Sequence, residues 1–235
     1  MSNSFNPRLL RRFKPARAMI AEDGQAIAPA QIELGRLLFY EPRISRDRSL
    51  SCNSCHALDR YGVDGLKTSR GYKGQSGGRN APTVYHAAGQ FEQFWDGRVG
   101  SIEAQALAPI LNPIEMAAPG ADYVVQTLKV FPEYQRAFAA AFPGEPDPIT
   151  FANVGKAIGA FERQLTTRSR WDDYLEGKAD ALTAEEITGL RSFTNLGCMV
   201  CHTGEFLGGS MYEKAGVVDP WPNLADHGRY QVTHE

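Results

Sequence analysis

The chain has 235 residues, of which 43% are hydrophobic and 22% are charged, and its formal net charge is −2 at pH 7. This is the composition of an ordinary globular protein, and the near-neutral charge gives no reason to expect a nucleic acid as partner. No apolar run of about 18 residues occurs, so no membrane-spanning segment is expected. The length suits one large or two small domains.

The first predicted helix covers residues 29–40. Its apolar residues fall on one face, and Pro29 suits a position in the first turn. Glu41 precedes Pro42, and the residue before a proline avoids the helical conformation. The helix is therefore expected to end here.

Two five-residue motifs, Cys52 to His56 and Cys198 to His202, each read C-x-x-C-H, the attachment signal for a c-type haem. Two thiols three positions apart can add to the two vinyl groups of one porphyrin. The adjacent histidine is then held against the iron as its proximal ligand. The motifs contain every cysteine of the chain, so two covalent haems are predicted and no thiol is left for a disulfide. The predicted haem-binding residues are Cys52, Cys55, His56, Cys198, Cys201 and His202.

Zinc and dithiol chemistry are the alternatives for these cysteines. Paired cysteines of a zinc ribbon are separated by roughly 15–20 residues, whereas 142 residues lie between Cys55 and Cys198. A redox dithiol needs only one C-x-x-C pair. Neither alternative explains a histidine directly after both pairs.

The motifs also bear on location, because haem attachment to C-x-x-C-H normally takes place outside the cytoplasm. Met1 to Ile20 contains Arg11-Arg12, but no apolar stretch follows, so this segment does not read as a signal peptide. We expect a periplasmic protein whose export signal has been removed or replaced.

A glycine-rich segment at residues 62–78 follows the first motif. Glycine at this density disfavours both helix and strand, so a loop is predicted. It could be a plain surface loop or a wrap over the open face of the haem. The next segment, Phe91 to Arg98, is dense in aromatic residues, and Trp95 within it could simply belong to the core.

Ser101 is a plausible N-cap for a helix that runs through Ala108 and is stopped by Pro109. Beyond it lies Glu115, a lone acid between two apolar residues. Such a carboxylate is either solvated at a turn or half-buried for a purpose. The residues alone favour the solvated interpretation.

Four further helices are predicted from their signals. Asp122 caps a segment that ends before Pro132, Pro132 opens the next, Pro148 opens a third, and Thr183 with Glu186 forms a capping box for the fourth. Their apolar stripes predict core positions rather than cofactor contacts. These positions are Val124, Val125, Leu128, Tyr134, Phe138, Phe142, Val154, Ile158, Phe161, Leu165, Ile187, Leu190 and Phe193.

No alternating strand pattern is evident, and no internal repeat occurs beyond the haem motif. The predicted fold class is all-α, with short helices and long loops. Large cofactors are expected to compensate for a modest apolar core.

These features together resemble the bacterial dihaem cytochrome c peroxidases, within the wider family that includes the MauG-type dihaem enzymes. The resemblance runs from about Phe13 to the end of the chain. Its most specific elements are Phe94 to Arg98 and the Glu115-Met116 pair. The matching segments are Leu34 to Phe39, both haem motifs, Gly78 to Thr83, Gln93 to Arg98, Pro113 to Met116, Phe131 to Tyr134, Ala160 to Arg163 and Gly208 to Tyr212.

The resemblance implies roles for particular residues. His56 matches the ligand of the peroxidatic haem, and His202 that of the electron-entry haem. Trp95 aligns with a tryptophan placed between the two haems, and Asn80 with a ligand of an interdomain calcium ion. Gln105 and Glu115 align with residues over the peroxidatic iron, and this changes the interpretation of Glu115 to a catalytic one. Met211 matches a position that is not a ligand.

The resemblance also implies two cytochrome-c-like domains. The first, with the peroxidatic haem, is expected at residues 19–166. The second, with the electron-transfer haem, is expected at residues 167–235 together with part of 1–18. Family members continue beyond the position of Glu235, so the second domain is expected to be truncated and to lack its distal haem ligand and further calcium ligands. A homodimer is also expected by analogy.

The implied reaction is reduction of hydrogen peroxide to two waters, with electrons from a small soluble cytochrome or copper protein. Glu115 would be the general base and then the general acid, with Gln105 orienting the peroxide and Trp95 assisting electron transfer. Two alternatives remain. One is a MauG-like oxidase that acts on a tryptophan or tyrosine of a partner protein, and the other is a dihaem electron carrier without catalysis.

The chain departs from the family pattern at Tyr72. Many family members have a histidine at this point of the glycine-rich loop, where it occupies the sixth site of the resting peroxidatic haem. A neutral phenol is a poor iron ligand, and a pKa of about 10 makes the phenolate form of tyrosine costly at neutral pH. His86 is the only histidine nearby in sequence, and it lies in a segment expected to be fixed. The haem of His56 is therefore predicted to be open at rest.

Overall fold

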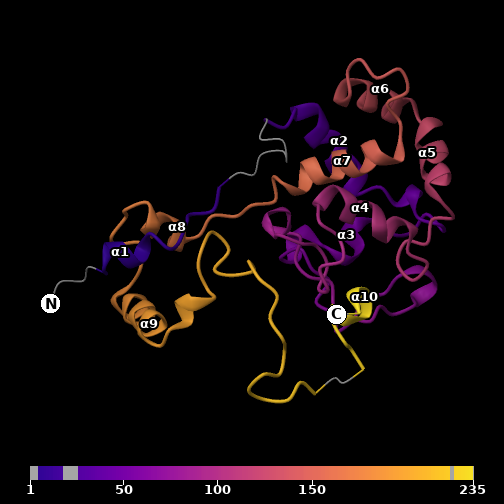
Figure 1. Cartoon of the computed structure of the whole chain (residues 1–235). Helices are drawn as coiled ribbons and strands as arrows, with labels where there is room; N and C mark the ends of the chain where they lie inside the picture. Colours follow the sequence, from indigo (N-terminus) through magenta and orange to yellow (C-terminus); the bar gives the residue numbers. More distant parts are fainter. Residues whose placement is uncertain (1–4, 18–25, 223–224, 235) are drawn as a thin grey trace. The chain divides into compact units, whose positions relative to one another are not determined.

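The structure is a computed structural model that describes residues 5–17, 26–222 and 225–234. It is mostly helical (Figure 1), as the sequence predicted. Within the described residues the only extended pairings are isolated bridges, and no strand forms. No described helix is long and apolar enough to cross a lipid bilayer.

The chain divides into two compact units. Of the described residues, the larger comprises 26–165 and 227–234, and the smaller comprises 5–17, 166–222 and 225–226. The chain passes from the larger unit to the smaller one after residue 165. Residues 227–234, however, were expected in the second domain and instead pack on the larger unit. The Arg229 guanidinium holds them there by donating to the backbone carbonyls of Asp96 and Gly97, at 3.1 and 2.6 Å.

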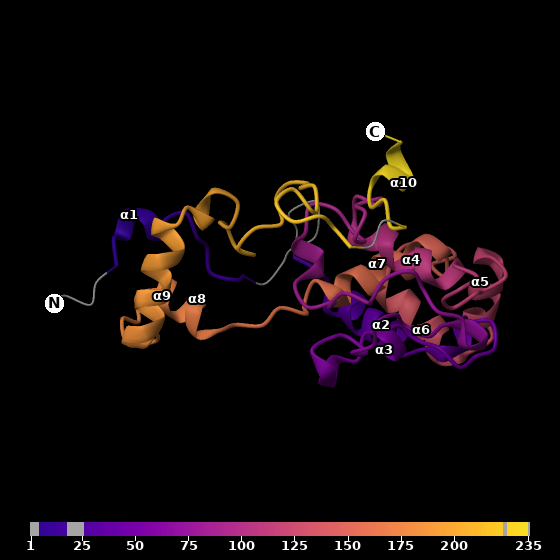
Figure 2. The same cartoon turned by 90° about the horizontal axis from the view of Figure 1, so that it is seen from below.

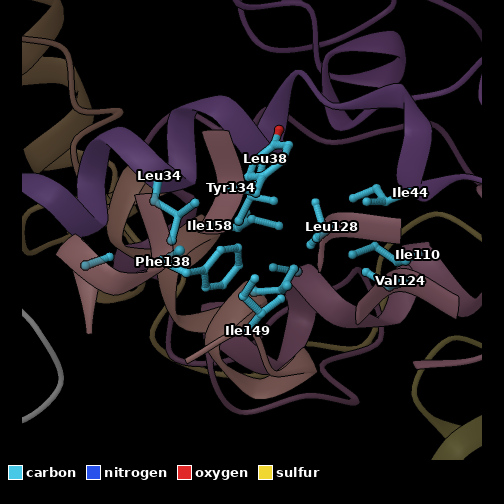
Figure 3. Close-up of a cluster of buried hydrophobic side chains, with 14 of the residues drawn as sticks. Leu34, Leu38, Ile44, Ile110, Val124, Leu128, Tyr134, Phe138, Ile149 and Ile158 are labelled. Atoms are coloured by element: carbon cyan, nitrogen blue, oxygen red, sulfur yellow. The ribbon is translucent and has the colours of Figure 1, made fainter. Parts of the chain in front are cut away.

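The larger unit is a cluster of helices around α7 (Phe151–Glu162), which packs against α2 (Pro29–Phe39) and α4 (Ile102–Leu111). Helices α5 (Ala121–Lys129) and α6 (Pro132–Ala141) complete it. Figure 3 shows apolar side chains from these helices converging on one core. Its fully buried members include Leu34, Leu38, Ile44, Ile110, Val124, Leu128, Phe138, Val154, Ala157 and Ile158.

Helices α2 and α7 approach so closely that a side chain at Gly35 is excluded. A Cβ atom there would lie 1.8 Å from the carbonyl oxygen of Ala157. The contact therefore requires glycine for space rather than for an unusual backbone angle. It holds α2 on α7, and the segment after α2 leads to the first haem motif.

Several predicted helix boundaries were wrong. Helix α4 continues through Pro109 to Leu111, because a proline near the end removes one backbone donor and the helix still closes with the Asn112 N–H on the Ala108 carbonyl, at 3.1 Å. The N-cap of α5 is Gly120, and Asp122 lies within its first turn.

The start of α7 was also misplaced. The helix is capped by the Thr150 hydroxyl, which accepts from the Asn153 N–H at 3.1 Å, so it begins after Thr150 and not at Pro148. Leu165 lies beyond its end but is still buried. The helices predicted from Pro29 and from Pro132 were confirmed.

The smaller unit contains α1 (Pro7–Leu10), α8 (Arg170–Leu175) and α9 (Ala184–Asn195), grouped together in Figure 2. Phe5, Tyr174 and Ile187 form its buried cluster. The capping box predicted at Thr183 and Glu186 is present at the start of α9. This unit is small, and many apolar side chains around the second haem motif are exposed. They include Leu196, Val200, Leu207, Met211, Tyr212, Val217, Val218 and Trp221.

Candidate functional site

The first C-x-x-C-H motif forms one turn of helix, α3 (Cys52–Cys55). Ser51 and Ser54 cap it reciprocally, and the Ser51 N–H donates to the Ser54 hydroxyl at 3.0 Å. The turn closes when the His56 N–H donates to the Cys52 carbonyl at 2.9 Å. Residues three apart on a helix share one side, so both thiols face the same way. All four cysteines of the chain are free, as the haem prediction requires.

The ring of His56 is oriented by backbone carbonyls. Its Nδ1 lies 3.0 Å from the Pro82 oxygen and 3.3 Å from the Gly62 oxygen. A carbonyl can only accept, so Nδ1 carries the proton and Nε2 keeps its lone pair for a metal. Burial lowers the pKa of His56 and so favours the neutral, ligating form. Burial also raises the pKa of the Cys52 thiol to about 12.

The second motif repeats this arrangement in the smaller unit. A short 3₁₀ turn spans Cys198–Val200, and the His202 N–H donates to the Cys198 carbonyl at 3.0 Å. Nδ1 of His202 lies 2.8 Å from the Leu207 oxygen, which again leaves Nε2 available. The next residue, Gly208, has φ of +129°, and a Cβ there would lie 3.2 Å from Nδ1. The loop after the motif is thus shaped around the imidazole.

These observations test whether the residues fit the haems that the motifs imply. In each motif the two thiols are unbridged, and the imidazole is tethered through Nδ1 with Nε2 left as a ligand. This donor set is that of a proximal haem ligand with its outer hydrogen bond already made. The residues present therefore fit the group at both motifs.

Glu115 lies in the turn that follows α4, and its side chain is half-buried. The Asn112 side-chain amide donates to Glu115 Oε1 at 2.9 Å. Burial raises the pKa of Glu115, while the positive charge of Arg98 and the Asn112 hydrogen bond oppose that rise. Burial raises the pKa of the Cys55 thiol, and the negative charges of Asp64 and Glu115 add to that rise, so the Glu115 carboxyl is within electrostatic reach of the first haem motif. The solvated-turn interpretation of Glu115 does not fit this environment.

The glycine-rich loop is fastened to the Glu115 turn. The Tyr72 N–H donates to the Glu115 carbonyl at 2.7 Å, and the Gln75 side-chain amide donates to the Pro113 carbonyl at 3.2 Å. A Cβ at Gly71 would lie 2.0 Å from the Ile114 oxygen and 2.8 Å from the Glu115 Cα. The loop thus supports the backbone of the candidate catalytic acid.

Gln105 and Trp95 are the other predicted catalytic residues. Gln105 lies half-buried on α4, and its side chain makes no hydrogen bond to any residue within the described ranges. Trp95 is 60% exposed, so it is not a core residue, and its Nε1–H donates to the Asn80 carbonyl at 3.0 Å. The structure thus joins Trp95 to Asn80, the residue expected to bind calcium, through the backbone of the latter.

The sequence reasoning missed an ionic cluster beside Glu115. Asp96 is 6% exposed and accepts from Arg79 at 2.8 Å and from Arg98 at 2.9 Å. The Arg98 guanidinium lies 3.5 Å from the centre of the Phe94 ring. Phe94 itself adopts a φ of +65°, which is uncommon for a bulky residue. The available signal was an acid and a base, Asp96 and Arg98, directly after two aromatic residues.

Tyr72 lies with its ring 5.6 Å from the Arg46 guanidinium and 5.3 Å from the Lys73 ammonium. Two cations near its ring mark a polar setting. His86 has φ of +61°, and its N–H donates to the Leu165 carbonyl at 2.8 Å. The backbone of His86 is thus fixed, as expected.

The fold and the two motifs define a class, namely helical redox proteins that hold two haems. The family described as Di-haem cytochrome c peroxidase matches residues 29–180. The chain therefore belongs to the di-haem cytochrome c peroxidase family, and haem is the cofactor that this membership implies.

Individual proteins with this kind of name are also similar to the chain in sequence. Cytochrome c551 peroxidase of Pseudomonas aeruginosa is 43% identical over 228 residues, and the match covers 94% of this chain and 65% of that protein. Methylamine utilization protein MauG of Methylorubrum extorquens is 35% identical over 194 residues, which are 82% of this chain and 54% of that protein. The chain thus spans less than two thirds of the length of these relatives.

A solved structure is also similar. It is that of a MauG-like protein associated with microbial copper homeostasis, with a TM-score of 0.78 and 31% identity. The match covers 99% of this chain and 72% of that one. The helical arrangement described above is therefore shared with a MauG-like protein.

Proposed function

We propose that this chain carries the two haem sites and the catalytic acid of a peroxidase that reduces hydrogen peroxide to water. The observation that carries the proposal is the position of Glu115. It is half-buried, anchored by Asn112 and the glycine-rich loop, and within electrostatic reach of the first haem motif. The naming of relatives as cytochrome c peroxidases supports it.

The cofactors in this proposal are two covalent haems c. Cys52 and Cys55 would hold the first, with His56 as iron ligand, and Cys198 and Cys201 the second, with His202 as iron ligand. When bound, haem supplies the peroxide-binding iron and the means to accept and deliver electrons. The protein residues supply orientation and proton transfer.

Glu115 performs the proton transfer in this proposal. Its carboxylate takes a proton from one peroxide oxygen and returns it to the other as the oxygen–oxygen bond breaks. Asn112 fixes the carboxyl, and Gln105 orients the peroxide. Arg98 favours the charged, basic form of Glu115 against the effect of burial. The sum is one peroxide, two electrons and two protons giving two waters.

The electrons come from a small soluble cytochrome or copper protein, enter through the smaller unit with His202, and pass by Trp95. A calcium ion at Asn80, a periplasmic location, a homodimeric assembly and the two cytochrome-c-like domains remain part of the proposal on the family analogy. Within the described residues no group of three or more histidine, cysteine, aspartate or glutamate side chains is arranged to hold a metal ion.

A MauG-like oxidase is the second candidate, and the MauG-like solved structure together with Tyr72 in place of the family's histidine favours it. Such an enzyme would use peroxide to oxidise a tryptophan or tyrosine of a partner protein. The dihaem electron carrier without catalysis is the third candidate, and the setting of Glu115 argues against it.

The test is steady-state consumption of peroxide by the haem-loaded protein with reduced cytochrome c as donor. A peroxidase turns over with two cytochromes oxidised per peroxide. An electron carrier shows no turnover, and a MauG-like oxidase turns over only with its protein substrate. Visible and EPR spectra of the same sample count the haems and report their ligands.

A further inference from the structure

The first described segment of the smaller unit, residues 5–17, is strongly basic. It contains five cationic residues and no acidic one, and all five cationic side chains are exposed. They are Arg8, Arg11, Arg12, Lys14 and Arg17. Within the described part of the chain none of them has an ion-pair partner, unlike Arg168 and Arg170 of the same unit. We call this segment the basic strap.

Apolar side chains hold the basic strap on the unit. Phe5 is buried against Tyr174 and Ile187. Phe13 is 5% exposed, and its ring meets Trp171 edge-on with centroids 5.2 Å apart. Successive side chains of an extended segment point to opposite faces, so the residues on either side of Phe13 point to solvent. The cationic face of the strap is thus fixed by the burial of its apolar face.

The strap runs beside the second haem motif. The Gly204 N–H donates to the Arg12 carbonyl at 2.8 Å, and the Lys14 N–H donates to the Gly204 carbonyl at 3.2 Å. Gly204 is two residues from His202, the iron ligand of the proposed electron-entry haem. Arg12 and Lys14 therefore flank the edge of that site.

Two acids lie next to the strap, and both are already engaged by its backbone. Asp172 accepts from the Ala16 N–H at 2.6 Å, and Glu205 accepts from the Arg17 N–H at 2.9 Å. Asp172 is also 5% exposed. These carboxylates fix the course of the strap and leave its exposed cationic side chains to face solvent.

We infer that the basic strap is a docking surface for an electron-donor protein with acidic side chains around its own redox centre. The inference rests on the proposed function, because it takes the second motif as the point of electron entry. Fixed positive charge beside a redox site attracts a negatively charged partner over a distance and orients it on encounter. Such attraction weakens as salt is added.

One donor in two charge states provides the probe. Unmodified mitochondrial-type cytochrome c has a basic face, and succinylation of its lysines makes the same protein acidic. Binding of each to the haem-loaded protein is measured by titration calorimetry at about 0.1 M ionic strength, where the Debye length is about 10 Å. We expect the succinylated form to bind more tightly, and the preference to disappear at about 1 M salt, where the Debye length is about 3 Å.

Matched variants test the position of the surface. Arg12→Gln combined with Lys14→Gln should weaken binding of succinylated cytochrome c by roughly 3- to 30-fold, as expected for two exposed ion pairs. Arg136→Gln combined with Lys156→Gln removes the same charge from exposed positions of the larger unit, and it should leave binding nearly unchanged. Equal effects of the two pairs, or tighter binding of unmodified cytochrome c, would overturn the inference.

Two further measurements separate the explanations. Vesicles of anionic phosphatidylglycerol test whether the strap is instead a membrane-binding surface. If the protein binds these vesicles through the basic strap but does not bind succinylated cytochrome c, the inference of a donor-docking surface is wrong. Peroxide reduction with hydroquinone, a neutral donor, tests the proposed function alone. Its absence, with charge-selective binding intact, counts against the peroxidase and not against the docking surface.

Discussion

Two carboxyl groups of the larger unit occupy very different settings, although burial raises the pKa of both. For Glu115, the charge of Arg98 and the hydrogen bond from Asn112 oppose the rise in pKa that burial causes. Glu162 is 4% exposed, its Oε2 has no hydrogen-bond partner among the described residues, and the charge of Glu103 adds to the effect of burial. The first setting limits the rise in pKa, whereas the second adds to it and favours a neutral acid.

Replacement of Glu115 by Gln tests the base directly. The variant keeps the shape and can keep a hydrogen bond near Asn112, but it cannot accept a proton. We expect peroxide to bind and its reduction to slow by roughly 10²- to 10⁴-fold, the usual contribution of general acid–base catalysis. Stopped-flow mixing with peroxide measures the rate. An unchanged rate would remove Glu115 from the mechanism.

Replacement of Glu162 by Gln tests whether this carboxyl is protonated in the folded protein, because protonation changes how the free energy of unfolding depends on pH. Burial, together with the charge of Glu103, raises the pKa of Glu162 in the folded protein to about 8, from an ordinary value of 4.5. Between these values the folded chain keeps a proton that the unfolded chain has lost, so the free energy of unfolding falls as pH rises across this range. Glu162→Gln should lack this fall and be more stable relative to the parent above about pH 8.

Urea unfolding at several pH values measures the effect. Glu185→Gln, on the exposed side of α9, is the control and should keep the pH dependence of the parent. If Glu162→Gln follows the parent at every pH, Glu162 is ionised in the folded state.

At the scale of elements, local signals predicted some features and contacts determined the rest. Pro132 opens α6 and Thr183 caps α9, because both act on their own backbone. The short helices α1 and α8 carry no periodic signal long enough to predict. The glycines at positions 35 and 71 meet backbone from distant segments, which no local pattern reveals.

In the candidate site, too, local sequence predicted some residues, and contacts between distant segments determined the others. Each haem motif is one continuous stretch of five residues, so its residues could be predicted directly from the sequence. The carbonyls that orient His56 come from Gly62 and Pro82, and the charge that acts on Glu115 comes from Arg98. These partners are set by the course of the loops, and residue types alone do not identify them.

The close approach at Gly71 gives a prediction for the glycine-rich loop. Gly71→Ala places a methyl group against the backbone of Ile114 and Glu115, so the loop or the turn has to move. We expect lower stability and slower peroxide reduction. Gly78→Ala, in the same loop, meets nothing within 4 Å and should have little effect on either property. Equal behaviour of the two variants in thermal unfolding and turnover would contradict the role assigned to Gly71.

The same loop bears on the resting state. Its Tyr72 lies beside Arg46 and Lys73, at the position where the resemblance led us to expect a histidine. We expect the haem of His56 to be open at rest, so that the fully oxidised protein reacts with peroxide without prior reduction. EPR of the oxidised protein should show a high-spin haem. A low-spin haem at this site, with no reaction until one electron is added, would show that another side chain occupies the sixth position.

At the scale of the whole molecule, Trp95 is the residue proposed to connect the haems. Its ring is 60% exposed and has one hydrogen bond, so Trp95→Phe should cost only about 1 kcal/mol of stability or less. We expect the variant to react normally with peroxide and to pass electrons between the haems more slowly. Stopped-flow spectra that resolve the two haems provide the rate, and a normal rate would leave Trp95 without a role in transfer.

Arg229 follows the smaller unit in sequence but binds the larger one, and this affects the order in which the parts of the protein can fold. Residues 166–226 belong to the smaller unit, together with the first described segment of the chain, and they interrupt the sequence of the larger unit. During synthesis the hydrogen bonds from Arg229 to the Asp96 and Gly97 carbonyls cannot form until this whole segment has been made. The turn that presents Trp95 and Arg98 is consequently among the last parts of the larger unit to reach its final form, after both haem motifs have left the ribosome.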